Sequence, residues 1–423
     1  MPEKNILSKK SLVDFSYMFS SNLIKKGLGF FREIILAFFF GSSGVYANYL
    51  FLKTIADFFS QFTLGNSLQA NLMPKFTKLY VNSDSVDLSG VIIFAKSFSW
   101  KLFLFSQIIQ IPIIWFINPE SKILFIGLSI LLGVVMSANF FNSVFLTILQ
   151  AKGEFKKHSV ATTLNLFVST VVLFPLLLLL DIVGVVLSRL FGVFTLTLKY
   201  IKPLLSEKGT QQATLSYSDF NLSVLLLGNF ANIIILLGRL VSGADGGNEI
   251  AFFTYSVVLL NTLLTAVVMN VNTLVLKFIS IKKDYKVILF STIVAALTSG
   301  ILVLIVHEFS DEIISFIFER GKFTSKDTSA TATYLRDISW SFIFIFISSS
   351  LFQPYFTLPQ SYLKSNSKYL ARPFVLAVIC FSIFLYFNSS GVRLNSLYMI
   401  YGLSAVSFVL SILAFLKYKK YVI

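Results

Sequence analysis

A chain of 423 residues that is 56% hydrophobic and only 13% charged has the composition of a polytopic membrane protein, which excludes a water-soluble globular protein. The formal charge of +15 would point to nucleic acid in a soluble domain, but here Lys and Arg cluster in the predicted cytoplasmic loops, where they meet anionic lipid head groups. The single cysteine excludes an internal disulfide framework.

The first half of the chain contains six apolar stretches, each long enough to cross the hydrocarbon core as a helix. A GSSG turn at 41–44 separates the first two, and an amphipathic, lysine-containing segment at 65–89 leaves the membrane. The predicted spans are 11–40, 45–64, 91–117, 122–149, 160–180 and 182–200.

A polar segment at 202–221 follows, and we interpret it as a cytoplasmic linker between an amino-terminal lobe, 1–201, and a carboxy-terminal lobe, 222–423. The second half repeats the layout with six further spans. They are 222–242, 250–279, 287–307, a helix that follows the amphipathic segment 308–337 and ends near 358, 373–387, and 394–416. The sequence therefore predicts an all-α integral membrane protein with about twelve transmembrane helices.

The distribution of positive charge predicts the orientation of these helices. Lys and Arg concentrate in one set of loops, and the opposite turns, such as GSSG and GADGGNE, are nearly free of them, so both termini are expected in the cytoplasm. An even number of helices in each half makes any internal repeat parallel. Such a duplication builds two six-helix bundles around a central cavity.

The first predicted helix carries an unusual group of charges. Lys25, Lys26, Arg32 and Glu33 lie among phenylalanines and isoleucines. Ionisable side chains at membrane depth cost on the order of 2.5–3.5 kcal/mol each, so they usually face a protein interior or a water-filled cavity. Three cations within eight residues indicate a cationic cavity that receives an anion. The alternative is structural: the lysines reach the nearer membrane surface, and Arg32 pairs with Glu33 or with a neighbouring helix.

Two more cations are candidates for binding the same anion. Lys53 lies four residues before Asp57 on one face of the second helix, so a mutually neutralised pair is at least as good an interpretation as a substrate contact. Arg239 lies near the end of the seventh predicted helix.

Enzymes that act on membrane lipids need catalytic acids, a histidine base or a metal site at the membrane face. The chain has only two histidines, His158 and His307, which the topology places on opposite sides of the membrane, and it has no HExxH, Walker or paired-carboxylate motif. We therefore expect a protein that is not an enzyme and that holds no metal or cofactor.

Two motifs resemble the MurJ/MviN family. KGLGFFRE at 26–33, followed by FFGSSG and NSLQANLMPKF, is similar to the opening of that family, whose first helix reads Arg-x-Leu-Gly-Phe-x-Arg-Asp before a Phe-Gly-rich turn. IFERGKFTSKDTSATATYLRDIS at 317–339 resembles the family's Phe-(Glu/Gln)-Arg-Gly-x-Phe segment, and FFTYSVVLLN resembles its eighth helix. The resemblance covers most of 11–370.

The resemblance implies a member of the MOP exporter superfamily, with two six-helix lobes and alternating access. This family moves undecaprenyl-diphosphate-linked saccharides, such as the peptidoglycan precursor lipid II, from the inner to the outer leaflet of the bacterial cytoplasmic membrane. Its paired cavity arginines fall on Lys26 and Arg32, and its following aspartate falls on Glu33. The expected partners are the lipid-linked saccharide, membrane lipids and cell-envelope polysaccharide enzymes, and no nucleic acid.

The sequence also departs from the family pattern. Charged family positions fall near Tyr46 or Ala47, near Phe59 and near Ser256, and each has lost its charge. A chain of 423 residues leaves no room for the two further helices that MurJ proteins usually carry. A different cargo, such as an O-antigen or capsule unit, is therefore one alternative. A non-transporting scaffold for polysaccharide synthesis is another. A cation-coupled small-molecule exporter is a further alternative, against which the basic first helix argues.

Overall fold

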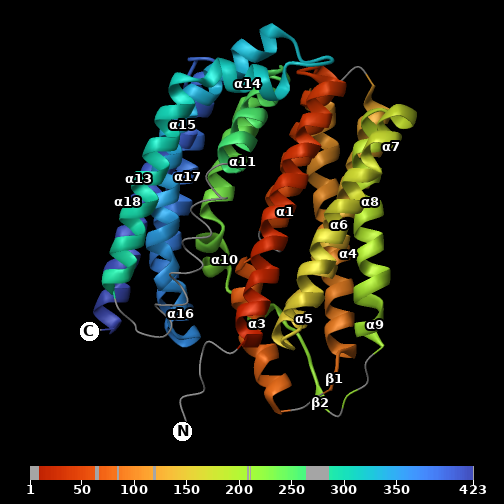
Figure 1. Cartoon of the computed structure of the whole chain (residues 1–423), viewed down its shortest axis with the longest axis vertical. Coiled ribbons are helices and arrows are strands. Elements are labelled where there is room, and N and C mark those ends of the chain that lie inside the picture. The colour runs from red at the N-terminus through yellow and green to blue at the C-terminus, as the bar shows by residue number, and fades with distance from the viewer. Residues whose placement is uncertain are drawn as a thin grey trace. The chain divides into compact units, whose positions relative to one another are not determined.

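The computed structural model describes residues 9–61, 66–82, 85–117, 121–206, 209, 211–262 and 285–422, and these are predominantly helical (Figure 1). The amino-terminal helices are α1 (Lys9–Phe40), α2 (Gly44–Gln61), α3 (Asn66–Asn82), α4 (Ser89–Ile117), α5 (Lys122–Ala151), α6 (Phe155–Val171), α7 (Leu173–Leu180), α8 (Ile182–Leu196), the π-helix η1 (Thr197–Ile201) and α9 (Lys202–Leu205). Two short strands, β1 (Val86–Asp87) and β2 (Gln211–Gln212), and the 3₁₀ turn η2 (Tyr217–Asp219) accompany them.

The later helices are α10 (Leu222–Gly228), α11 (Phe230–Ser242), the helix Glu249–Thr262, α13 (Tyr285–Glu308), α14 (Ser310–Phe318), α15 (Ser325–Phe352), the 3₁₀ turn η3 (Gln353–Thr357), α16 (Gln360–Asn366), α17 (Lys368–Phe387) and α18 (Val392–Val422). In Figure 1, α13, α15, α17 and α18 run side by side, as their mutual contacts require.

Within the described ranges, eight helical segments are long and apolar enough to cross a membrane, or nine when α10 and α11, which are bent by 75°, count as one span. The other three predicted spans begin as α1, α2 and the helix Glu249–Thr262. Compared with the eight segments above, α1 contains more charged residues, α2 is less apolar than their most apolar stretches, and Glu249–Thr262 is shorter. The remainder of the predicted eighth helix, 263–279, lies outside the described residues. The predicted fold class, an all-α integral membrane protein, is confirmed.

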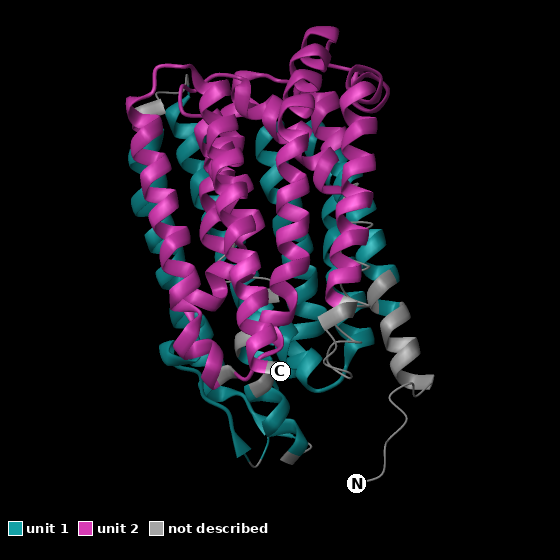
Figure 2. Cartoon of the chain, turned by 90° about the vertical axis from the view of Figure 1, so that its left-hand side faces the viewer, with its two compact units in different colours: residues 1–32, 63–114, 121–220 teal, residues 33–62, 115–120, 221–423 magenta. Residues whose placement is uncertain are grey.

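Contacts divide the chain into two compact units, coloured separately in Figure 2. Unit 1 comprises 1–32, 63–114 and 121–220, and unit 2 comprises 33–62, 115–120 and 221–423. The boundary in α1 falls between Arg32 and Glu33, so this one continuous helix contributes to both units. The lobe limits inferred from the sequence stay a prediction.

The segment that we interpreted as a linker folds onto unit 1. Its strand β2 pairs in parallel with β1, in the register Val86–Gln211, and Ala213 donates its backbone N–H to Asp87 O at 2.8 Å. These pairs satisfy backbone groups that would otherwise need water. At its end, Phe220 stacks on Phe94, at 5.8 Å between ring centroids, and joins an apolar core formed with α3, α4 and α5.

In unit 2, the two segments that carry the family resemblance meet at their turns. Lys322 donates its N–H to Phe38 O at 2.9 Å, and the Tyr255 hydroxyl donates to Gly41 O at 2.9 Å. The Ser42 hydroxyl donates to Asp327, whose carboxylate also forms a capping box with Thr324 at the start of α15. Residues nearly three hundred positions apart are thereby held in one compact turn region.

The Lys75–Asp219 ion pair predicts acid sensitivity of the β2 and η2 segment, which lies outside the membrane-spanning helices. Burial raises the pKa of the Asp219 carboxyl, but the hydrogen bond from Lys75 at 2.8 Å, bonds from Ser216 and the charge of Lys75 outweigh it and lower the pKa below its ordinary value. The stabilisation is therefore present above the unfolded pKa of about 4 and is lost as pH falls through the lower folded pKa. Amide exchange of 211–221, corrected for intrinsic rates, should accelerate as pH falls from about 6 to 3.

The variant Asp219→Asn supplies the control for this measurement. It lacks the titrating carboxylate, so its exchange should be faster at pH 6 and should change little on acidification. An equal acid response in both proteins would contradict the assignment to Asp219.

A side chain at position 321 is expected to lower the stability of the protein by steric overlap. The φ of Gly321, +63°, favours glycine, and an added Cβ would lie 2.4 Å from Phe38 O. Gly321→Ala should therefore cost about 2 kcal/mol or more in thermal unfolding in detergent. Gly391→Ala is the matched control, because Gly391 has φ +87° with nothing within 4 Å of the added Cβ. Equal melting temperatures for the two variants would refute the clash with Phe38.

Candidate functional site

The charges of α1 lie on different faces of the helix. Residues seven positions apart fall on nearly the same face, because seven residues make almost two turns. Ile24 and Phe31 form one such stripe and are 51% and 55% exposed, as expected for side chains that face lipid. Lys26 is also exposed but lies about 200° further round the helix than Ile24. Its side chain therefore lies on a different face from Ile24 and Phe31, three residues after Leu23, which is 54% exposed.

Lys25 belongs to the stripe that packs on α6. It is half-buried, and its Nζ donates to Thr162 Oγ1 at 3.3 Å. One turn earlier, the buried Ser21 hydroxyl donates to Ser159 O at 3.1 Å and lies 2.7 Å from Thr163 Oγ1. This stripe joins α1 to the first two turns of α6 through polar contacts.

Arg32 lies on the same stripe and is only 3% exposed. Its Nη1 donates to Ser169 O at 3.1 Å, and its Nη2 donates to Val185 O at 2.8 Å and Ser188 Oγ at 3.0 Å. The guanidinium thus fastens α1 to both α6 and α8. Its predicted role in binding an anion stays a prediction, since an anion would have to displace these acceptors.

The remaining sequence candidates lie in unit 2. Glu33 is half-buried and accepts a hydrogen bond from the Tyr46 hydroxyl at 3.3 Å. Lys53 forms an ion pair with Asp57, as the structural interpretation of that spacing required. Arg239 is buried in α11. The structure thus groups Lys25, Lys26 and Arg32 on unit 1 and places the other three candidates separately.

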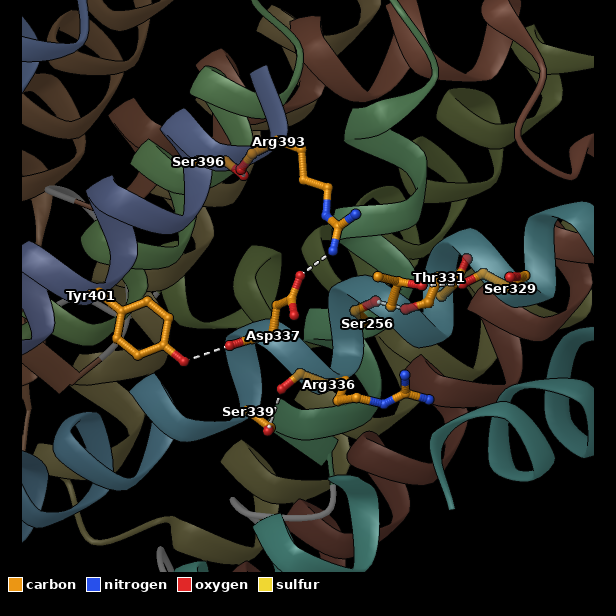
Figure 3. Close-up of polar contacts among 10 residues, drawn as sticks. Ser256, Ser329, Thr331, Arg336, Asp337, Ser339, Arg393, Ser396 and Tyr401 are labelled. Atoms are coloured by element: carbon orange, nitrogen blue, oxygen red, sulfur yellow. Dashed lines mark hydrogen bonds and ion pairs between the residues drawn. The ribbon is translucent and has the colours of Figure 1, made fainter. Parts of the chain in front are cut away.

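Two positions where the family pattern has lost its charge are sealed inside unit 2. Tyr46 is buried and stacks on Tyr49 and Tyr255, with centroid distances of 6.0 and 5.9 Å. Ser256 is also buried and donates to Thr331 O at 2.8 Å (Figure 3). Neither environment would accommodate an unpaired charge.

Sequence analysis missed a polar cluster in unit 2, shown in Figure 3. Arg393, at the start of α18, forms an ion pair with Asp337 of α15, and the Tyr401 hydroxyl donates to Asp337 O at 2.5 Å. The Arg393 guanidinium also lies 5.7 Å from the centroid of the Tyr334 ring. Nothing local in the sequence relates residues 56 positions apart, so only the packing of α15 on α18 reveals the pair.

Comparison with known proteins identifies the fold. No protein-family sequence model matches the chain, and no curated protein matches it by sequence. A structure of the lipid II flippase MurJ in an inward closed conformation matches with a TM-score of 0.74 and 19% identity, over 95% of this chain and 87% of that chain. An outward-facing structure of a multidrug resistance MATE family transporter of the MOP superfamily matches with a TM-score of 0.57 and 13% identity, over 97% and 95%.

The protein has a MurJ-like fold. A MOP superfamily transporter from Pyrococcus furiosus, described by the reverse polarity of its binding pocket, matches with a TM-score of 0.52 and 14% identity, over 97% and 95%. The MurJ-like fold confirms the resemblance that the motifs of α1 and of 317–339 indicated. These neighbours are transporters and a flippase, and at such identities the likeness is one of fold.

The buried position of Arg32 predicts a stability effect that separates it from Lys26. Arg32→Met removes three hydrogen bonds from a charged donor, each worth about 1.5–3 kcal/mol. The melting temperature in detergent should fall clearly for Arg32→Met and hardly for Lys26→Met, because Lys26 is exposed. Similar melting temperatures for both variants would show that Arg32 does not fasten α1 to α6 and α8.

Proposed function

We propose that the protein is a flippase that moves an undecaprenyl-diphosphate-linked saccharide from the inner to the outer leaflet by alternating access of its two lobes. The cargo is a surface-polysaccharide unit or a peptidoglycan precursor. The observation that carries the proposal is Lys26, an exposed cation within the predicted membrane span of α1, in a chain with a MurJ-like fold.

The chemistry of the cargo supports this proposal. A diphosphate-linked sugar has an anionic, hydrated head that does not cross hydrocarbon unaided, so it needs a polar and cationic path. An exposed ammonium within a membrane helix is stable only beside water or an anion. Because Lys26 is exposed on a different face of α1 from Ile24 and Phe31, it is suited to receive such a head group.

The other candidate residues are proposed as additional contacts for the head group of the cargo. Lys25 supports Lys26 as a second point charge, and Arg32 joins them in a conformation in which its guanidinium leaves the carbonyls of α6 and α8. Glu33 accepts from sugar hydroxyls. Arg239 is a further contact for the head group. Lys53 becomes another contact once its ion pair with Asp57 opens.

We also propose the bacterial cytoplasmic membrane as the location, with both termini on the cytoplasmic side, because the loops richest in Lys and Arg are retained there. Cell-envelope polysaccharide enzymes are the proposed protein partners, since they supply the lipid-linked saccharide and extend it after translocation.

A non-transporting scaffold for polysaccharide synthesis is the second candidate. The observation that favours it is the burial of Tyr46 and Ser256, which leaves unit 2 without the charges that the family carries there. The multidrug transporters among the structural neighbours favour an exporter, but the cations of α1 would repel a cationic drug.

Reconstitution in liposomes tests the proposal. Vesicles hold either lipid II or a short undecaprenyl-diphosphate-linked surface oligosaccharide, and an impermeant probe reads exposure in the opposite leaflet. Lys26→Ala should slow movement about 10- to 100-fold, because a hydrogen bond to a charged group is lost. Lys326→Ala is the matched control, since Lys326 is an exposed lysine outside this group, and it should move lipid at the wild-type rate.

The pattern of movement distinguishes the candidates. Movement of the surface oligosaccharide alone assigns a polysaccharide unit as cargo, and movement of lipid II assigns the peptidoglycan precursor. If the folded wild-type protein moves neither lipid, the flippase proposal fails and the scaffold is favoured.

A further inference from the structure

His158, which the sequence alone did not relate to the cations of α1, lies near the contact of Lys25 with α6. It is half-buried in the first turn of α6, and Thr162, which accepts the hydrogen bond from Lys25, lies one turn further along the same face. His158 therefore precedes, by one turn of α6, the residue that the Lys25 ammonium contacts. Lys25 and His158 therefore share one face of unit 1, next to the exposed Lys26.

The His158 ring is oriented by α5. Its Nδ1 lies 3.3 Å from Nε2 of Gln150, which is 5% exposed. In this arrangement the amide nitrogen donates and Nδ1 accepts, so the ring proton sits on Nε2 and the imidazole presents an N–H donor. Gln150 thus acts as a positioning residue that selects the tautomer of His158.

This group of donors has no acidic partner in the described part of the chain. Glu154, the carboxylate at the start of α6, already pairs with Lys157 at 3.0 Å. Among the described residues, the charged side chain beside Lys25 is Lys26, which is also a cation. Two neighbouring ammonium groups and an imidazole N–H without a carboxylate match the acceptor-only oxygens and the negative charge of a diphosphate.

From this geometry we infer that Lys25 and His158 form a phosphate-binding site on unit 1 for the diphosphate of a polyprenyl-linked saccharide, with Gln150 and Thr162 as positioning residues. This inference rests on the proposed function and adds a residue, His158, that contacts the head group directly. Because α6 follows a basic loop, the site lies at the inner-leaflet end of the proposed path and serves as the entry point for the cargo.

Binding of undecaprenyl diphosphate to the purified full-length protein in a neutral detergent tests the site. Lys25→Met should weaken binding about 10- to 100-fold, and His158→Phe, which loses a neutral hydrogen bond, about 3- to 10-fold. Lys157→Met is the matched control, because it removes a cation from the same turn of α6 and should change the affinity less than twofold.

Two conservative variants separate a direct contact from a structural role. The His158→Gln side chain places its amide nitrogen near the position of the ring Nε2 and should keep the affinity within about threefold of wild type. His158→Asn places it near Nδ1 instead and should bind like His158→Phe. Equal affinities for His158→Gln and His158→Asn, or wild-type binding by His158→Phe, would overturn the inference, and the pair remains informative if His158→Phe does not fold.

Competition identifies the source of the phosphate. Inorganic diphosphate should compete weakly and phosphatidylglycerol should not compete at equal concentration, because the site is assigned to a diphosphate attached to a polyprenyl chain. Displacement by phosphatidylglycerol would overturn that assignment in favour of a phospholipid site.

Transport in liposomes separates this inference from the proposed function. If the wild type transports the lipid and His158→Phe transports it equally well, the His158 site is refuted and the flippase proposal stands. Absence of wild-type transport would refute the flippase proposal itself.

Discussion

The contact on which this structure depends most is the buried Arg32 guanidinium, held by the carbonyls of Ser169 and Val185 and by the Ser188 hydroxyl. A charge in an apolar helix must find acceptors, and here α6 and α8 supply them. Once Arg32 is held there, the rotation of α1 is set. Lys25 turns towards α6, Ile24 and Phe31 are exposed on a second face, and Lys26 is exposed on a third.

The chemistry of the proposed site is concentrated in unit 1. In unit 2, Tyr46 and Ser256 occupy positions at which the family carries charge, and both are buried with polar partners of their own. In the same unit, Arg393 is paired with the Asp337 carboxylate. A MurJ-like fold is shared by a flippase and by multidrug transporters, so the fold alone does not select a cargo. The selection proposed here rests on the local chemistry of α1 and α6.

The same helix joins both units. Upstream of Arg32, α1 is tied to α6 by hydroxyls and by Lys25, and downstream of Glu33 it ends in a turn that contacts the Arg320–Asp327 region. Gly321 makes the second connection possible, because a side chain there would overlap the Phe38 carbonyl. Both motifs that resemble the MurJ/MviN family therefore serve packing as well as any role in transport.

The sequence by itself determined the membrane class, the positions of the apolar spans and the group of charges formed by Lys25, Lys26, Arg32 and Glu33, because hydropathy and helix length follow directly from residue composition. Only the tertiary structure decided which stripe meets α6 and which stays accessible, since that choice depends on acceptors far away in the chain. For the same reason, the Asp337–Arg393 pair, the pairing of β1 with β2 and the position of His158 beside Lys25 emerged only from the packed helices.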